Sequence, residues 1–147
     1  MLTLDVQLVN RAAPCHLLAW RSWTLKRVAT GTLSAETQAM EQAVGRLEWL
    51  SRLIAWAAGV SLPVDLRTDC KSLQQAIATC HAQEDKRLAV QLESLKEDLG
   101  SGKIRSIHHI PGLINPADAL TKKASTASID RLREVAHSGL LRDIDPG

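Results

Sequence analysis

Three acidic residues stand at similar places along this chain. Glu36, Asp69 and Asp118 each lie at or just inside the predicted start of a helix, after an extended segment or a loop. In an α/β sheet, sites form where strand ends meet the following loops and helices. Carboxylates from separate segments are the oxygen ligands that Mg²⁺ requires, and two such ions about 3.5–4 Å apart can activate water against a phosphodiester. The spacing permits such a site but does not show that the three residues converge.

Helix capping is the alternative explanation for the same three residues. Acidic side chains near a helix start stabilise unpaired N–H groups and the macrodipole by roughly 0.3–1 kcal/mol. The segment "NPAD" fits this alternative well, with Asn115 as the N-cap, Pro116 at the first helical position and Asp118 at the third. Both interpretations stay open on chemistry alone.

The first half of the chain predicts a hairpin and a long helix. Residues 1–9 and 15–23 alternate as strands do, with a connection at 10–14. Ser34 is then a predicted N-cap and Gly59 a predicted helix end. Between them a helical face recurs at Met40, Ala43, Leu47, Leu50, Ile54 and Ala57. Glu36 falls on this face, in the predicted first turn, although the helix is expected to bury that face.

The second half alternates strands with helices. A strand at 63–68 leads into a helix over 70–80, and a further helix carries Leu88, Leu92, Leu95 and Leu99 on one stripe, closed by Gly100 and Gly102. Residues 103–110 predict a strand and 111–124 a loop and a helix start. Residues 125–141 predict a last helix with Ser128 as its cap. This order indicates one α/β domain with a mixed sheet.

Composition and charge narrow the class of protein. The chain has 147 residues, 45% of them hydrophobic and 23% charged, which is typical of a globular domain. It has no apolar run near the roughly 20 residues that span a bilayer, and an odd cysteine count without a C-x-x-C pair. We expect an intracellular protein, cytoplasmic or nuclear, with no membrane partner. Two basic segments, 11–27 and 122–123, suit either a polyanion near the acidic residues or a solvated surface.

Three segments, in order, resemble the copia-type retrotransposon polyproteins. "LLAWRSWTLKRVATGTLSAETQAMEQAV" is similar to a W-x-S-x-K strand leading into an A-E-x-x-A helix. "LRTDCKSLQQAI" resembles the family's strand–TD-x-x-S-L–helix segment. "EDKRLAVQLESLKEDLGSGKIRSIHHIPGLINPADALTKKAS" is similar to its ending, which contains N-x-A-D-x-L-TK. The matches span roughly residues 15–125, and this part of the family's polyprotein is the ribonuclease H domain of a reverse transcriptase.

The resemblance implies a fold, a reaction and a set of site residues. The implied fold is ribonuclease H-like, a five-stranded mixed sheet flanked by helices, and the implied reaction is cleavage of RNA in RNA–DNA hybrids with two Mg²⁺ ions. The family's second, third and fourth acidic residues fall on Glu36, Asp69 and Asp118, with metal ligation as their role. The candidate phosphate contacts are Arg21, Ser22, Lys26, Arg27, Lys71, Ser72 and Lys122. The implied partners are the hybrid and the rest of a reverse transcriptase polyprotein.

The chain also departs from the family pattern. The family's first aspartate lies on its first strand, whereas this chain is expected to begin within the second strand, and Asp5 is the only acidic residue nearby. Leu113 stands about where many ribonucleases H have a loop histidine. We therefore expect residues 1–125 to form a ribonuclease H-like domain that lacks its first strand, and 126–147 a C-terminal helix and tail. A catalytically inactive nucleic-acid-binding domain, or a remnant, is the alternative function.

Overall fold

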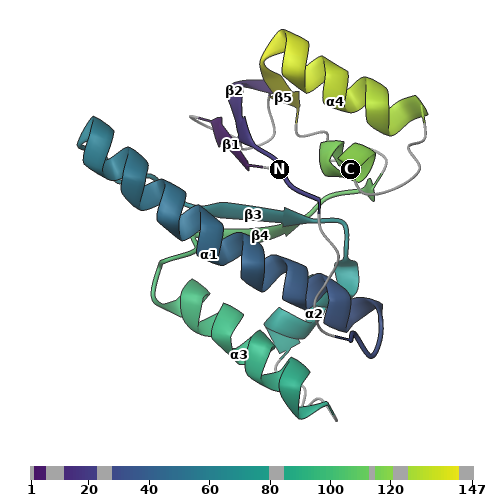
Figure 1. Ribbon diagram of the computed structural model, residues 1–147. Helices are drawn as coiled ribbons and strands as arrows, with labels where there is room; N and C mark the ends of the chain where they lie inside the picture. Colours follow the sequence, from purple (N-terminus) through teal and green to yellow (C-terminus); the bar gives the residue numbers. More distant parts are fainter. Residues whose placement is uncertain are drawn as a thin grey trace. The chain divides into compact units, whose positions relative to one another are not determined.

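A computed structural model of the chain describes residues 2–5, 12–22, 28–79, 85–112, 115–120 and 126–142 (Figure 1). The chain forms two compact units. One consists of residues 25–109, here called the helical unit, and the other of residues 1–24 together with 110–147. Both contain helices and strands, so the predicted α/β class is confirmed at that level.

The helical unit is built around a pair of parallel strands. Its elements in chain order are α1 (Thr32–Ala58), β3 (Asp65–Thr68), α2 (Lys71–Thr79), α3 (Lys86–Gly100) and β4 (Ser106–His109). β3 and β4 pair in parallel, with Asp65 opposite Ser106 and Thr68 opposite His109. Parallel neighbours cannot be joined by a tight turn, so α2 and α3 form the crossover between them.

The core of the helical unit joins all three helices to β3. The predicted leucine stripe of α3 is confirmed, because Leu88, Leu92 and Leu95 are buried and Leu99 packs against the same cluster. The other buried members come from α1, β3, α2 and the residue pair before β4: Met40, Val44, Leu66, Leu73, Ile77 and Ile104. The buried residues recur at helical spacing on α3 and at alternate positions on β3, as the periodicities of a helix and a strand require.

Helix α1 begins earlier than the sequence pattern predicts. Gly31 is the N-cap, in an extended conformation and without a side-chain cap bond, so the prediction of Ser34 as the cap is wrong. Ser34 is instead buried inside the helix, where its hydroxyl accepts a hydrogen bond from Gln38 at 3.3 Å. Glu36 therefore lies beyond the first turn. The predicted end at Gly59 is confirmed, because this residue has the left-handed φ of 69° that favours glycine.

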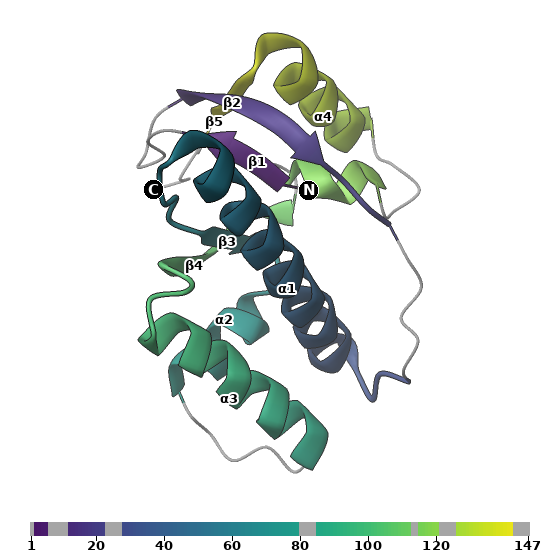
Figure 2. The same cartoon turned by 60° about the vertical axis from the view of Figure 1, so that its left-hand side comes forward.

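Burial along α1 is confined to its first half. The buried residues are Ser34, Thr37, Gln38, Met40 and Val44. Farther along the predicted buried face, Ile54 is only half-buried and Ala57 is exposed, so the prediction of one continuous buried face is wrong. The physical reason is length, because the 27 residues of α1 outrun the 15 residues of α3. Figures 1 and 2 both show the C-terminal half of α1 extending beyond α2 and α3.

An ion cluster fastens the end of α3 to the middle of α1. The Lys103 ammonium lies 3.0 Å from the carboxylates of both Glu48 and Asp98. Hydrogen bonds to Asp98 and Glu48 raise the pKa of Lys103, and the same bond from Lys103 lowers the pKa of Glu48. These groups are largely exposed, so the cluster orients the two helices more than it stabilises the chain.

The other unit contains a three-stranded antiparallel sheet. Its elements are β1 (Leu2–Asp5), β2 (Ala12–Ala19), the 3₁₀ helix η2 (Pro116–Leu120), α4 (Thr126–Ser138) and β5 (Leu140–Arg142). The sheet order is β1-β2-β5. β1 pairs with β2, so the predicted opening hairpin is confirmed, although β2 begins at Ala12 rather than at residue 15.

The C-terminal prediction is wrong in two details. α4 begins at Thr126 and buries Ser128 within it, so Ser128 is not the cap. The helix ends at Ser138 rather than running to residue 141, because Gly139 has a left-handed φ of 61° and β5 follows at once. The predicted domain boundary after residue 125 stays a prediction. None of the helices in the described ranges is both long enough and apolar enough to span a membrane.

Asp85 caps α3 and links its start to the segment before α1. Its carboxylate accepts hydrogen bonds from the Thr30 hydroxyl at 3.0 Å and from the backbone N–H groups of Leu88 at 3.3 Å and Arg87 at 2.9 Å. Together these bonds hold the pKa of Asp85 below its ordinary value. Asp85→Ala should lower the midpoint of thermal unfolding by about 2–4 °C, the shift expected from one lost N-cap in a chain of this size.

Circular dichroism melts at neutral pH measure this effect. Glu97→Ala is the matched control, because it removes the same charge from an exposed position of α3 and leaves the cap intact. Equal shifts in the two variants would contradict a specific role for the cap.

Candidate functional site

The carboxyl ends of the two parallel strands lie side by side. Thr68 ends β3 directly opposite His109, which ends β4. The Thr68 side chain is buried, and its hydroxyl accepts a hydrogen bond from the N–H of Cys70 at 3.1 Å. This local bond shapes the turn from strand to helix, as serine and threonine often do. Asp69 stands on that turn and is half-buried, so it occupies the place where α/β sheets commonly form sites.

Two predicted phosphate contacts follow Asp69 at the start of α2. Lys71 is the first residue of the helix and Ser72 the second, and both are exposed. The Ser72 hydroxyl oxygen lies 3.2 Å from the Cys70 sulfur. A helix start offers backbone N–H groups and a positive dipole end to an anion. Asp69, Lys71 and Ser72 are thus brought together at one strand-to-helix turn.

Glu36 is the fifth residue of α1 and is half-buried. The polar residues next to it are more deeply buried, and the Thr37 hydroxyl donates to the Leu33 carbonyl at 2.7 Å. Because the macrodipole effect falls off within the first turn, capping does not explain an acidic residue at this position. Capping was the alternative account of Glu36, and the position of the residue argues against it.

Asp118 lies in the short helix η2, where the capping prediction is confirmed. The Asn115 side-chain oxygen accepts a hydrogen bond from the N–H of Ala117 at 3.1 Å, and Pro116 opens the helix. Asp118 itself is half-buried in the first turn, and its N–H donates to the Asn115 carbonyl at 3.2 Å. Asn115 therefore caps η2, and Asp118 stands in its first turn, where an acidic side chain also favours a helix start.

The three acidic residues are divided between the two units. Glu36 and Asp69 belong to the helical unit and Asp118 to the other. Their oxygen ligands are of the kind that Mg²⁺ requires. However, across the ranges that the structure describes, no group of three or more His, Cys, Asp or Glu side chains could hold a metal ion. The convergence of the three acidic residues stays a prediction.

The remaining predicted phosphate contacts lie in the other unit or outside the described residues. Arg21 and Ser22 are exposed directly after β2, next to the exposed Trp20. Exposed arginine beside an aromatic ring is a combination that nucleic-acid-binding surfaces use. Lys26, Arg27 and Lys122 lie outside the described residues.

The strand pairing also places residues that the sequence did not indicate. Arg67 lies opposite His108, one position before the Thr68–His109 pair. Strand alternation therefore puts Arg67 and His108 on one face of the pair and Thr68 and His109 on the other. The sequence signal was the run "HHI" at the end of a predicted strand, but its register against β3 could not be read without the fold.

Asp65, the first residue of β3, joins β3 to the segment that begins β4. Arg105 Nε donates to its carboxylate at 2.9 Å, a second Arg105 nitrogen pairs with its other oxygen, and the Ser106 hydroxyl also donates to it. Partial burial acts to raise the pKa of Asp65, but the hydrogen bonds from Arg105 and Ser106 outweigh it and hold that pKa below its ordinary value. Asp65 therefore fixes the strand that leads to Asp69.

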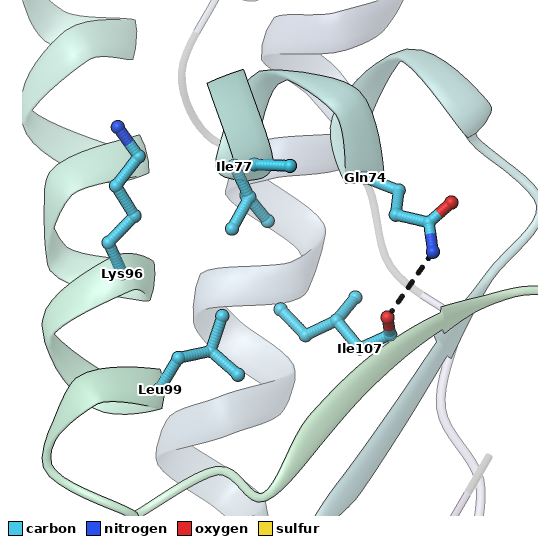
Figure 3. A pocket seen from close by; sticks show the side chains of 6 residues that line it. Gln74, Ile77, Lys96, Leu99 and Ile107 are labelled. Carbon is cyan, nitrogen blue, oxygen red and sulfur yellow. Dashed lines mark hydrogen bonds between the residues drawn. The ribbon is translucent and has the colours of Figure 1, made fainter. Parts of the chain in front are cut away.

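A small pocket of about 310 Å³ lies between α2, α3 and β4 (Figure 3). Its lining is Gln74, Ile77, Ala78, Lys96, Leu99 and Ile107. Gln74 Nε2 donates to the Ile107 carbonyl at 3.5 Å, which closes one side. The Lys96 ammonium points away from Ile107 and pairs with Glu93 at 2.8 Å. Because the lining contains no carboxylate, this pocket is not the predicted acidic site.

Comparison of the chain with protein-family models, with curated proteins and with solved structures finds no match.

The acid-side stability of the chain should depend on Asp65. Its folded pKa is depressed, so its contribution is fully present above the unfolded value of about 3.9 and is lost as the pH falls through the folded pKa. Asp65→Asn should reduce the free energy of unfolding at about pH 7 by about 0.5–1 kcal/mol, allowing for solvent screening of the partly exposed pair. Urea unfolding of both proteins from about pH 7 to about pH 3 measures it, and the difference should shrink below about pH 4.

Asp130→Asn is the control, because Asp130 is exposed and pairs with the exposed Arg133 at 3.5 Å. A difference for Asp65→Asn that stays constant across the acid range would contradict the role given to its charge.

Proposed function

We propose that this chain is a ribonuclease H-like domain of the copia type, which cleaves the RNA strand of RNA–DNA hybrids with the help of two Mg²⁺ ions. The observation that supports it best is the position of Asp69, directly after β3 at the carboxyl end of a parallel strand pair and two residues before the exposed Lys71. A carboxylate at such a strand end, followed by a helix start that suits a phosphate, is an arrangement fit for phosphodiester chemistry.

In this proposal Glu36, Asp69 and Asp118 ligate the metal ions. The ions would activate a water molecule and stabilise the leaving oxygen. The protein's own contribution is to hold the nucleic acid. Lys71, Ser72, Arg21 and Ser22 are exposed and would contact backbone phosphates, which position the duplex without reading its sequence. The predicted contacts Lys26, Arg27 and Lys122 would bind phosphates in the same way.

The alternative is a ribonuclease H-like domain that binds nucleic acid without cleaving it. One observation favours it. The family's first aspartate has no clear counterpart in the residues given, where Asp5 is the only acidic residue near its place. The basic and polar groups around Asp69 would then bind phosphates with no metal chemistry. The two proposals predict different outcomes with the same hybrid.

Cleavage of a labelled RNA–DNA hybrid in Mg²⁺ tests the enzyme directly. Asp69→Asn keeps the size of the side chain but removes its charge, and it should lower the cleavage rate by about 100-fold or more. The matched control is Asp65→Asn, which removes a carboxylate from the same stretch but from a position engaged by Arg105. The control should retain cleavage at a temperature well below its unfolding midpoint. An unmodified chain that leaves the hybrid intact would contradict the enzyme proposal.

Hybrid binding as a function of salt tests the alternative. If Lys71 contacts a phosphate, Lys71→Ala should lower the slope of log affinity against log salt by about one and weaken binding equally for all sequences. Lys86→Ala is a closely matched control, because Lys86 is also the exposed first residue of a helix, α3. Unlike α2, α3 does not follow the end of a strand. Equal effects of the two substitutions would place the nucleic acid elsewhere. The absence of hybrid binding at low salt would end this proposal as well.

A further inference from the structure

The C-terminal half of α1 carries an exposed apolar stripe. It consists of Trp49, Leu53 and Trp56, spaced four and three residues apart, so that all three lie on one face of the helix. Their exposed fractions are 67%, 43% and 83%, and Val60, just past the helix end, is 51% exposed. We call these four residues the tryptophan stripe. Scattered exposed apolar residues are ordinary, but two neighbouring indoles on one helix face form a contiguous patch.

The stripe is not the exposed edge of a face that this half of α1 buries in the core. None of residues 45–58, all of which the structure describes, is buried, although this half of α1 also contains Leu47, Leu50 and Ile54. The helix therefore extends a largely apolar half beyond the core that anchors its first half (Figure 2). Exposing this apolar surface to water is unfavourable, and a partner that covers it would remove the unfavourable exposure.

Gly45 leaves room for a close approach on the same face. It lies one turn before Trp49, in the interior of a 27-residue helix, where glycine is unfavourable relative to alanine. A Cβ added at Gly45 would meet no atom of the described residues within 4 Å, so no contact among them requires a glycine there. A group from another molecule could pack closely against the helix backbone at this position.

We propose that the tryptophan stripe is the interface of a homodimer, in which the stripe of a second copy of this chain covers it. With roughly 150–250 Å² for one exposed tryptophan side chain, the stripe leaves about 450 Å² open. Two stripes face to face would bury about 900 Å², and their polar rims would bring the total to about 1,000 Å², the lower limit for a specific interface. The dimer is therefore weak and concentration-dependent.

The spacing of the stripe fits a two-fold axis. Leu53 lies near the midpoint between Trp49 and Trp56, so an antiparallel pair of helices crossing at Leu53 sets Trp49 of one copy against Trp56 of the other. The same register brings Val60 over the flat surface at Gly45. An antiparallel arrangement also places the buried first halves of the two α1 helices at opposite ends of the interface.

The charges beside the stripe are compatible with self-association. Arg52 lies at its edge, and its guanidinium pairs with Glu48 of the same helix at 2.6 Å. In the dimer the Arg52 side chains of the two copies would lie near the two-fold axis. The Glu48 partner of each Arg52 offsets the repulsion between these two positive charges. A highly charged ligand would instead require charges that the stripe itself does not contain.

Sedimentation velocity of the full chain over micromolar to submillimolar concentrations tests the proposal. The chain should pass from monomer to dimer, and Trp49→Glu and Trp56→Glu should each raise the dissociation constant at least about tenfold, as loss of a central aromatic contact does. Trp20→Glu is the matched control, because Trp20 is 65% exposed but lies outside the stripe. It should change the constant by less than about twofold. Far-ultraviolet circular dichroism verifies that each variant is folded.

Two further variants test the geometry. Leu53→Cys should form an intermolecular disulfide under a mild oxidant much faster than the unmodified chain, because the two Leu53 positions meet at the axis. Gly45→Ala should raise the thermal midpoint of the monomer, since alanine favours helix, while weakening the dimer, since its methyl group occupies the close approach.

Three results would overturn the proposal. In the first, the chain stays monomeric at the highest concentration. In the second, the dimer forms equally well with both glutamate substitutions in the stripe. In the third, Trp20→Glu weakens the dimer as much as those substitutions do. Monomeric behaviour combined with stripe-dependent binding of single-stranded nucleic acid, or of a different protein, would assign the stripe to that ligand instead.

Discussion

The parallel pairing of β3 with β4 is the constraint on which the helical unit depends. Parallel strands need a long crossover, so the segment from Asp69 to Arg105 must leave the sheet and return to it. α2 and α3 do this, and the leucines of α3 belong to the same buried cluster as Leu66. The register of the two strands then determines which side chains face the core and which face outward. Leu66 and Thr68 turn inward, while Asp65 turns to meet Arg105 and Ser106.

The same constraint gives Asp69 its position. A residue that directly follows a strand in a parallel pair stands at the edge where loops and helix starts gather, whatever its own chemistry. Capping does not explain Glu36, which lies past the first turn of α1, whereas Asp118 stands in the first turn of a helix that Asn115 caps. The position of Asp69 at the end of a parallel strand supports a functional role, and cleavage and binding are the two forms that the role could take.

The sequence predicted the elements better than their ends or their partners. Periodicity found the α3 stripe because four leucines on one face have few other uses, and Gly59 marked the end of α1 because only its backbone tolerates that turn. Ser34 misled as a cap because a serine can equally be buried when Gln38 bonds to its hydroxyl. β5 was missed because its three residues directly follow a helix in a run of similar composition. The role of Asp65 needed Arg105, which is distant in sequence, so no local pattern could reveal it.

The contact between Asp65 and Ser106 has a consequence for the order of folding. It joins residues 41 positions apart, and closing so long a loop costs conformational entropy before any strand bond is made. Helix formation in α2 and α3 relies on neighbours in the sequence, shortens that loop and carries its ends toward each other. The helices are thus expected to form first and the strand pair last. The turn at Asp69 would then take its final shape only when the helical unit is otherwise complete.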